Sequence, residues 1–450
     1  MMMGDGPLGD SLILKSLSRL ASYWRILSAG HGCGQRHSVF SRSSARLRRL
    51  LSDPERILGI DRLSRISGMV LVFILFARPV TDILWKYPMN YIIAFMAILF
   101  GLLHVMLDLD QVVKHRFVAY YILFLSFGIL LSFSQVMISV HSVRQLGFFL
   151  VIPGMYLMAR AYVRKKDDAV RLMNLIIASS FMPALYAPVQ YMAQKGIMLY
   201  NLFMYRYSST FAHPNTFAFY LHTIIMACLI MGFYTRKARY AIYASLMGSI
   251  LIMTYSRAII ALASVSVIAF IFRDRTRSTK MLFSLAIVIL ILANPFLMRR
   301  LTQASLALDM SGRLVIWDFF LNQPSRTLLL GGGFGYSRIL SRGLVHRIWG
   351  APDTIHPHND WILLLLETGL PGLILVMLCF MGVLASCIGA SRSDDRLIRY
   401  FGAIMLIMTC SVALLMFVQE VSAKSSFIYL YPVLLGTLHK LTDFEDEHQA

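Results

Sequence analysis

Apolar runs of about 20 residues recur along most of this 450-residue chain. Each run is long enough to cross a hydrocarbon layer of roughly 30 Å. Lipid offers no hydrogen-bond partners to backbone amides and carbonyls, so a run that crosses it must be helical. Only 15% of the residues are charged, far fewer than the wetted surface of a soluble protein this long requires. The sequence therefore predicts an all-α integral membrane protein.

The positions of the apolar runs predict about twelve transmembrane helices. They also predict a basic cytoplasmic N-terminal segment at 1–66, the first nine helices within 67–297, an outer loop at 298–370, the last three helices within 371–438 and a cytoplasmic tail at 439–450. The predicted spans are 67–85, 89–107, 117–137, 146–163, 172–193, 214–233, 240–256, 258–272, 281–297, 371–389, 400–418 and 425–438.

The basic residues support this topology. Lys and Arg gather in alternate connections between the runs, whereas the short connections around 86–88, 138–145 and 419–424 are poor in them. Cytoplasmic loops of membrane proteins carry this excess, so the pattern predicts that both termini are cytoplasmic. The predicted cytoplasmic cations are Lys114, Arg116, Arg164, Lys165, Lys166, Arg236, Lys237, Arg239, Arg273, Arg275, Arg277, Lys280, Arg392, Arg396 and Arg399.

The net charge of +20 does not indicate a nucleic-acid partner, because the basic residues form no aromatic-interleaved basic domain. Residues 1–66 contain no secretory signal core, and their stretch Leu12–Leu27 has the spacing of a helix lying on a membrane surface. The alternatives are a disordered basic tail and a start codon assigned too early. Four of the five cysteines lie inside apolar runs, so no disulfide framework is expected.

Two longer segments, 194–213 and 298–360, both fall on the predicted outer side, where long ordered loops are often functional. The second ends at His358 and Asn359, before an apolar stretch that carries Glu367 and is broken at Gly369 and Gly372. Neutral imidazole accepts a proton near neutral pH, so His358 is a candidate general base at the mouth of the bundle. The structural alternative is that it caps the helix that follows.

Three arginines lie on the same predicted side: Arg206, Arg257 and Arg313. The guanidinium group is permanently charged, and its planar fork matches phosphate oxygens. Such a charge at a bilayer is costly unless it faces a polar cavity or a partner. The alternatives are a turn residue that reaches the interface for Arg257, and a surface ion pair with Asp309 or Asp318 for Arg313.

Two other features favour structural interpretations. Arg78 and Asp82 stand one helical turn apart in the first span, which predicts an ion pair inside the bundle, with a substrate role as the alternative. The run Gly331–Gly335 lacks the Lys–Ser/Thr of a phosphate-binding loop, which favours a tight turn. The outer acidic residues form no clustered pair for a divalent ion, and His356 with His358 makes a weak metal site, so metal-independent chemistry without a cofactor is expected.

Together these residues resemble the O-antigen ligases and the related O-antigen and exopolysaccharide polymerases of bacterial envelopes, over roughly 200–390. The resemblance implies a GT-C-type glycosyltransferase with one large periplasmic loop in the bacterial inner membrane. It implies that His358 acts as the base and that Arg257, Arg313 and Arg206 hold the donor diphosphate. The motifs that carry the resemblance are Phe211–Tyr220, Thr254–Ala258, Ser311–Trp317, Leu329–Ser337, His358 with Asn359, and Gly369 with Gly372.

The implied donor is an undecaprenyl-diphosphate-linked glycan within the membrane lipid, and a chain-length regulator is a further candidate partner. The favoured activity is that of a polymerase, which adds glycan to a second lipid-linked glycan, because nothing in the sequence marks recognition of lipid A-core. The alternative within the family is a ligase that transfers the glycan to lipid A-core. The alternative from another class is a transporter or flippase for the same lipids, which would place charges near the bilayer midplane.

Overall fold

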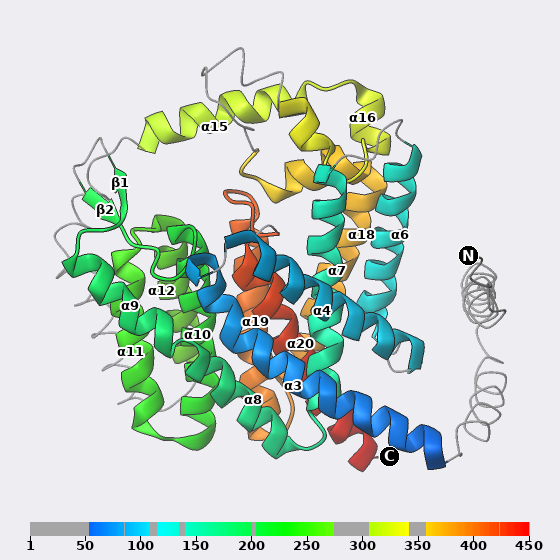
Figure 1. Cartoon of the computed structure of the whole chain (residues 1–450), viewed down its shortest axis with the longest axis vertical. Helices are drawn as coiled ribbons and strands as arrows, with labels where there is room; N and C mark the ends of the chain where they lie inside the picture. Colours follow the sequence, from blue (N-terminus) through cyan, green and yellow to red (C-terminus); the bar gives the residue numbers. More distant parts are fainter. Residues whose placement is uncertain are drawn as a thin grey trace, which may run out of the picture.

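The computed structural model describes residues 54–84, 86–107, 115–134, 140–199, 204–273, 306–341, 357–422 and 424–449. These residues are helical apart from connections and one antiparallel hairpin, in which strand β1 (Ile197–Leu199) pairs with strand β2 (Met204–Arg206). The helices, shown in Figure 1, are α3 (Pro54–Leu84), α4 (Lys86–Leu107), α6 (Arg116–Ser134), α7 (Val140–Tyr162), α8 (Lys166–Ser179), α9 (Phe181–Met192), α10 (Pro214–Thr235), α11 (Ala238–Met253), α12 (Arg257–Arg273), α15 (Leu306–Leu321), α16 (Ser325–Leu330), α18 (Asp360–Ala390), α19 (Arg396–Leu415) and α20 (Ser425–Gln449).

In the described part of the chain, seven helical segments are long and apolar enough to cross a membrane. Three shorter apolar helices accompany them: Met89–Val105, Ala238–Met253 and Arg257–Phe270. The predicted helical membrane architecture is therefore confirmed, while the number of about twelve spans stays a prediction. The predicted span at 281–297 lies outside the described residues. The seven segments are Arg62–Asp82, Arg116–Ser134, Val140–Tyr162, Lys166–Met192, Pro214–Thr235, Asp360–Ala390 and Arg396–Leu415.

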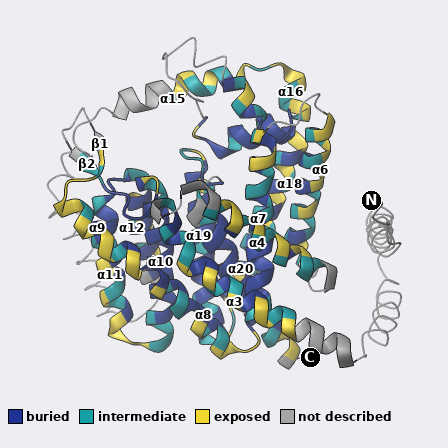
Figure 2. Ribbon diagram, viewed as in Figure 1, coloured by how far each residue is buried: buried dark blue, intermediate teal, exposed yellow. Residues whose placement is uncertain are grey.

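Helix α10 lies at the centre of one group of helices, and 83% of its most apolar stretch is buried inside the protein (Figure 2). It packs against α8, α11, α12, α19 and α20. Its sequence is apolar all round rather than on one face, which is the pattern of a helix enclosed by others. This group fixes the N-terminus of α10, where the functional candidates gather.

Helix α7 links that group to the rest of the bundle. Small residues let its backbone approach its neighbours: a Cβ added to Gly154 would lie 2.2 Å from the Ala97 carbonyl oxygen in α4. Near the opposite end of α7 from the candidate site, the buried Arg160 guanidinium donates to the Asp443 carboxylate of α20 at 2.7 Å. Close backbone packing and this buried pair together fix α7 against α4 and α20.

Helix α18 contains the break that its glycines predict. Gly369 has φ +63° and ψ −172°, a conformation that a side chain would strain, and the helix resumes after it. The amides of Gly332 and Gly333 donate to the carbonyls of Leu366 and Glu367, both at 2.8 Å. The predicted glycine-rich turn is confirmed, and its role is to satisfy the carbonyls that the break exposes.

The same turn also inserts into the bundle. The Phe334 ring lies against α6 so closely that a Cβ on Gly128 would meet it at 2.1 Å, and the Phe334 amide donates to Ser132 Oγ at 2.9 Å. The segment after α15 is therefore packed against α6 and α18, which lie side by side in Figure 1. This packing holds residues 325–341 in place beside the first half of α18.

Two helix bounds differ from those expected. The predicted span 172–193 consists of α8 and α9, separated at Ser180, whose hydroxyl donates to the Ile177 carbonyl at 2.6 Å. The span expected at 371–389 is one helix from Asp360, because helical geometry resumes after the break at Gly369. Apolar runs locate spans well but do not show where a helix pauses or resumes within them.

Candidate functional site

His358 is exposed in the turn that precedes α18, with φ +48°, which is uncommon for a residue other than glycine. It does not cap the helix. Asn359 does, because its side-chain oxygen accepts hydrogen bonds from the amides of Trp361 and Ile362 at 3.0 and 3.1 Å. The interpretation of His358 as the cap of α18 is therefore wrong, because Asn359 caps this helix.

Asp360 ties this turn to the connection between α19 and α20. Its amide donates to the Met416 carbonyl at 2.8 Å. Its carboxylate accepts from the amides of Val421 and Ser422 at 2.6 and 2.8 Å, and from the Ser422 hydroxyl at 2.7 Å. This fully buried carboxylate thus fixes 416–422 next to His358.

Helix α15 holds the other side of the same turn. The Trp317 indole N–H donates to the Pro357 carbonyl at 2.8 Å, and Arg313 Nη1 donates to the Val418 carbonyl at 3.2 Å. Arg313 and Trp317 stand four residues apart, on one face of the helix. In the described part of the chain, no ion pair joins Arg313 to Asp318, so the surface-pair interpretation finds no support there.

Arg206, at the end of β2, joins two further connections. Its Nε donates to the Thr254 carbonyl at 3.0 Å, and its Nη2 donates to Asn215 Oδ1 at 2.5 Å and to Ser256 Oγ at 3.0 Å. Asn215 lies in the first turn of α10, and Ser256 immediately precedes Arg257, the first residue of α12. The hairpin therefore fixes the position at which Arg257 enters the bundle.

His213 is a functional candidate that the sequence analysis did not single out. Its Nδ1 caps α10 by accepting from the Asn215 amide at 3.0 Å. The residue is exposed, and partial desolvation of its ring lowers the pKa of His213 to about 4, so the ring is neutral near pH 7. Smaller effects on this pKa come from Lys424, Arg206 and His358, which therefore lie near it. The sequence feature that could have identified His213 is the His–Pro–Asn run at the start of α10.

Lys424 is the second candidate that sequence reasoning missed. It lies between the Asp360-bound turn and α20, and burial lowers its pKa. Glu420 and Asp360 oppose this shift, whereas Arg206 adds to it. The sequence feature that could have identified Lys424 is its position in a short connection, 419–424, that is otherwise poor in Lys and Arg.

These contacts gather all four predicted site residues at one end of the bundle, called the outer end below, formed by 204–213, 254–257, 313–317, 357–360 and 416–424. His213 lies near His358, Arg206 and Lys424, and the Arg206 network reaches Arg257 through Ser256. Arg313 joins the same end through Val418. Positive charge and two exposed imidazoles, those of His213 and His358, therefore share this end, an arrangement that suits an anionic substrate.

The predicted pair of Arg78 and Asp82 is confirmed, with Nη1 and Oδ1 at 3.0 Å. It also supports the outer end, because Asp82 Oδ2 accepts from the Ala212 amide at 3.2 Å. Thr210 donates its hydroxyl to the Pro79 carbonyl. The pair therefore anchors the segment that leads into His213.

The supporting residues after His358 act within the α18 break. Ser337 donates its hydroxyl to Glu367 Oε1 at 2.8 Å, which links the glycine-rich turn to the helix. The backbones of Gly331 and Gly369 lie in close contact. A Cβ added to Gly331 would lie 2.6 Å from the Gly369 amide nitrogen, and a Cβ added to Gly369 would lie 2.6 Å from the Gly331 amide nitrogen. Gly372 is packed against Thr368. These residues shape the scaffold of α18.

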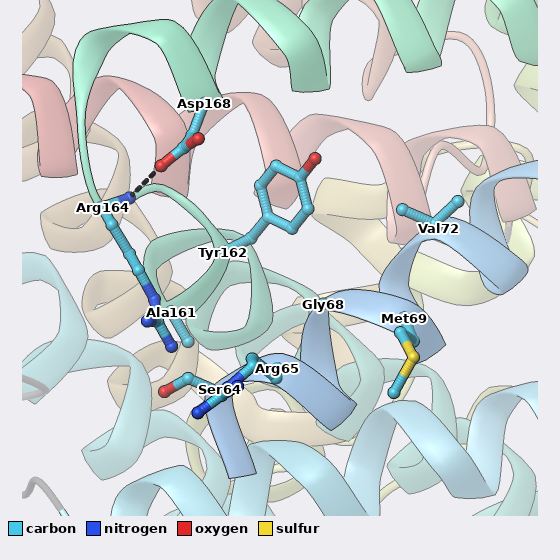
Figure 3. A pocket seen from close by; sticks show the side chains of 9 residues that line it. All are labelled: Ser64, Arg65, Gly68, Met69, Val72, Ala161, Tyr162, Arg164 and Asp168. Carbon is cyan, nitrogen blue, oxygen red and sulfur yellow. Dashed lines mark hydrogen bonds between the residues drawn. The ribbon is translucent and has the colours of Figure 1, made fainter. Parts of the chain in front are cut away.

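One cavity of about 500 Å³ lies elsewhere, between the N-terminal half of α3 and the connection from α7 to α8 (Figure 3). Its lining includes Arg65, Tyr162 and Arg164, far along α3 from Arg78. It is therefore separate from the outer end. Within the described ranges, no three or more His, Cys, Asp or Glu side chains gather as a metal site.

Comparison with known families agrees with the resemblance seen in the sequence. Residues 242–377 match the model of the O-antigen ligase family. No curated protein matches the chain. The matched range holds Arg257, Arg313 and His358, whereas Arg206 and Lys424 lie outside it and are brought to the site by the fold. The chain is a multi-pass membrane protein whose residues 242–377 are similar to the O-antigen ligase family.

Proposed function

We propose that the protein transfers a glycan from undecaprenyl diphosphate to a sugar hydroxyl at the periplasmic face of the bacterial inner membrane. We place both termini in the cytoplasm, so that the outer end faces the periplasm. The observation that carries the proposal is the gathering of the exposed His358 imidazole with the predicted arginines at that end. A lipid-linked anion enters from the membrane, whereas a sugar acceptor arrives from water, and both reach this end.

In the proposed reaction, the acceptor oxygen attacks the anomeric carbon of the donor sugar. The bond from that carbon to the diphosphate oxygen breaks, and undecaprenyl diphosphate leaves with the bonding electron pair. His358 takes the proton of the acceptor hydroxyl. Attack from the face opposite the leaving group inverts the anomeric centre.

The proposed arginines act on the leaving group. Arg257 and Arg313 bind the diphosphate, and Arg206 adds positive charge while holding the start of α12. Fixed positive charge stabilises the negative charge that develops on the leaving oxygen, and no metal ion is needed for this. We assign the protein to the GT-C glycosyltransferases on this arrangement of membrane helices and outer loop.

The polymerase is the favoured activity. A polymerase joins two lipid-linked glycans, whereas a ligase would transfer the glycan to lipid A-core. Lipopolysaccharide gels of a deletion strain separate them: loss of a polymerase leaves core capped with a single repeat, loss of a ligase leaves bare core. Loss of secreted polymer with normal lipopolysaccharide identifies an exopolysaccharide polymerase.

The test of transferase activity is a purified-protein assay with a defined lipid-linked donor and acceptor. His358→Ala should abolish transfer while the protein still inserts and folds. The control is His104→Ala, because His104 bonds to Ser67 in α3 and lies in α4, outside the outer end. Near-normal transfer by His358→Ala would exclude His358 as the base. Translocation of the donor lipid without any glycan transfer would instead identify a flippase.

A further inference from the structure

The cavity between α3 and the α7–α8 connection lies at the end of α7 opposite the outer end (Figure 3). Its volume of about 500 Å³ falls within the range of small-molecule sites, roughly 300–1,000 Å³. Two guanidinium groups line it, those of Arg65 in α3 and Arg164 in the connection. Because a guanidinium matches phosphate and carboxylate oxygens, the cavity is a candidate site for an anion.

The wall on α3 changes from basic to apolar along one face of the helix. Arg65, Met69 and Val72 stand at positions i, i+4 and i+7, and all three line the cavity. Arg65 is the fourth residue of the membrane-crossing segment Arg62–Asp82. At 1.5 Å per residue, Val72 therefore lies about 10 Å deeper in the membrane than Arg65.

The wall opposite α3 changes in the same direction. The crossing segment of α7 ends at Tyr162, and Arg164 follows two residues later. Gly68 lets the two walls approach, because a Cβ added there would lie 3.1 Å from Tyr162 Cδ2. Figure 3 shows Arg164 and Val72 on opposite sides of the Tyr162 ring. The cavity therefore has cations at the membrane boundary and apolar groups beyond them, which is the order of headgroup and acyl chain in a phospholipid.

Asp168 also lines the cavity, but it does not cancel the two arginines. Its Oδ2 accepts from the backbone amides of Arg164 and Lys165 at 3.1 and 3.2 Å. The carboxylate is thus held by the N-terminus of α8, whose amides carry partial positive charge. Arg171 Nη1 lies 3.9 Å from its Oδ1. With two arginines and one carboxylate bound in this way, the lining keeps a net positive charge.

We propose that this cavity binds an anionic phospholipid of the leaflet opposite the outer end. Its phosphate lies between Arg65 and Arg164, and an acyl chain follows Met69 and Val72. A free phosphate uses the arginines alone and leaves the apolar wall uncovered, so the lining favours a lipid. Basic pockets between membrane helices bind lipid headgroups through the same charge-assisted hydrogen bonds. The bound lipid joins α3 to the α7–α8 connection.

The test measures lipid binding by the purified full chain, delipidated in a neutral detergent. Phosphatidylglycerol, phosphatidylcholine with the same acyl chains, and inorganic phosphate are each titrated, with the Kd and the ligand-induced shift in Tm as readouts. Phosphatidylglycerol should bind about tenfold more tightly than phosphatidylcholine, because the choline cation is repelled. Inorganic phosphate should bind about 100-fold more weakly than phosphatidylglycerol, because it buries no methylene groups. Equal affinity for the two lipids, or for phosphate and phosphatidylglycerol, would overturn the proposal.

Two variants test the two walls of the cavity separately. Arg65→Gln and Arg164→Gln should each weaken phosphatidylglycerol binding about 10- to 100-fold, the size expected for one charged hydrogen bond. Both side chains are exposed, so the Tm without lipid should equal that of the wild type. Arg65→Lys should bind more tightly than Arg65→Gln, because the charge remains. An unchanged Kd for phosphatidylglycerol in both glutamine variants would overturn the proposal.

The matched control is Arg392→Gln. Arg392 is exposed and does not line the cavity. It lies at the same end of the bundle, because Lys166 of α8 pairs with the nearby Asp395 at 2.7 Å. The control should bind phosphatidylglycerol as the wild type does. Weakening as large as that of Arg65→Gln would show general attraction of this basic end to anionic lipid, and the proposed cavity site would fall. Because the readout is binding, the result is independent of glycan transfer.

Discussion

The indole N–H of Trp317 in α15 donates to the carbonyl oxygen of Pro357, the residue before His358, at 2.8 Å. This hydrogen bond joins α15 directly to the turn that presents the imidazole. Because His358 has a positive φ, its backbone needs such support from outside the turn. We therefore expect Trp317 to position His358 without contacting substrate.

Trp317→Phe keeps the aromatic packing and removes the donor. We expect kcat to fall about fivefold, as one hydrogen bond of about 1 kcal/mol predicts, while the KM for donor changes little. Steady-state kinetics of the purified protein measure both. Trp361→Phe is the control, because it removes an indole hydrogen bond to Ala413 instead. A raised KM for donor with unchanged kcat would contradict the positioning role.

Arg257 and Arg313 should each be essential for transfer. Replacement by Ala should lower kcat by about 100- to 1,000-fold, the usual effect of removing one group that stabilises developing charge. Lysine at either position should restore little of it, because the planar fork is lost. Transfer assays on matched membrane preparations measure the effect. Full rescue by lysine would show that only charge is needed there.

Gly369→Ala should destabilise the fold. The positive φ alone costs about 1–3 kcal/mol for a residue with a side chain, and the new Cβ would lie 2.5 Å from the Leu330 backbone. Gly389→Ala lies in the same helix and meets no atom within 4 Å, so its stability should be unchanged or raised. Thermal unfolding in detergent compares the two. Equal Tm values would show that the break tolerates a side chain.

Stability should fall in acid because of His213. The unfolded chain takes up a proton at His213 near pH 6.5, whereas the folded chain does so only near pH 4. The unfolded state thus binds more protons between these values, so this contribution to stability is present above pH 6.5 and is lost as the pH falls toward 4.

His213→Asn tests this pH dependence, because asparagine is a good helix cap that does not titrate. The variant should lose less Tm than the wild type between pH 7 and 4.5. Unfolding curves recorded across that range give the comparison. Identical pH profiles for both proteins would show that another group causes the acid instability.

The helices and several local features could be predicted because each depends on nearby residues. Apolar runs give the spans, and the four-residue spacing of Arg78 and Asp82 gives their ion pair. Glycine content predicted both the turn at 331–335 and the break at Gly369. These features follow from backbone freedom and helix geometry, which the sequence shows directly.

The remaining parts of the site depend on contacts between distant segments. Lys424 lies near Arg206 only because Asp360 draws the α19–α20 connection against α18. Arg206 reaches Asn215 and Ser256 because a short hairpin turns it back, and no strong strand pattern announces that hairpin. One sequence without its fold shows neither long-range approach, so the sequence analysis named the arginines and His358 as candidates but not Lys424.

The crossing of Gly331 and Gly369 has a consequence for exchanging parts between relatives. Each glycine leaves the space that the other backbone occupies, and the amides of one segment satisfy carbonyls of the other. A chimera that inherits 325–341 from one parent and 360–372 from another would combine two surfaces shaped separately. Functional hybrids should therefore arise when both stretches come from the same donor sequence, whatever the origin of the residues between them.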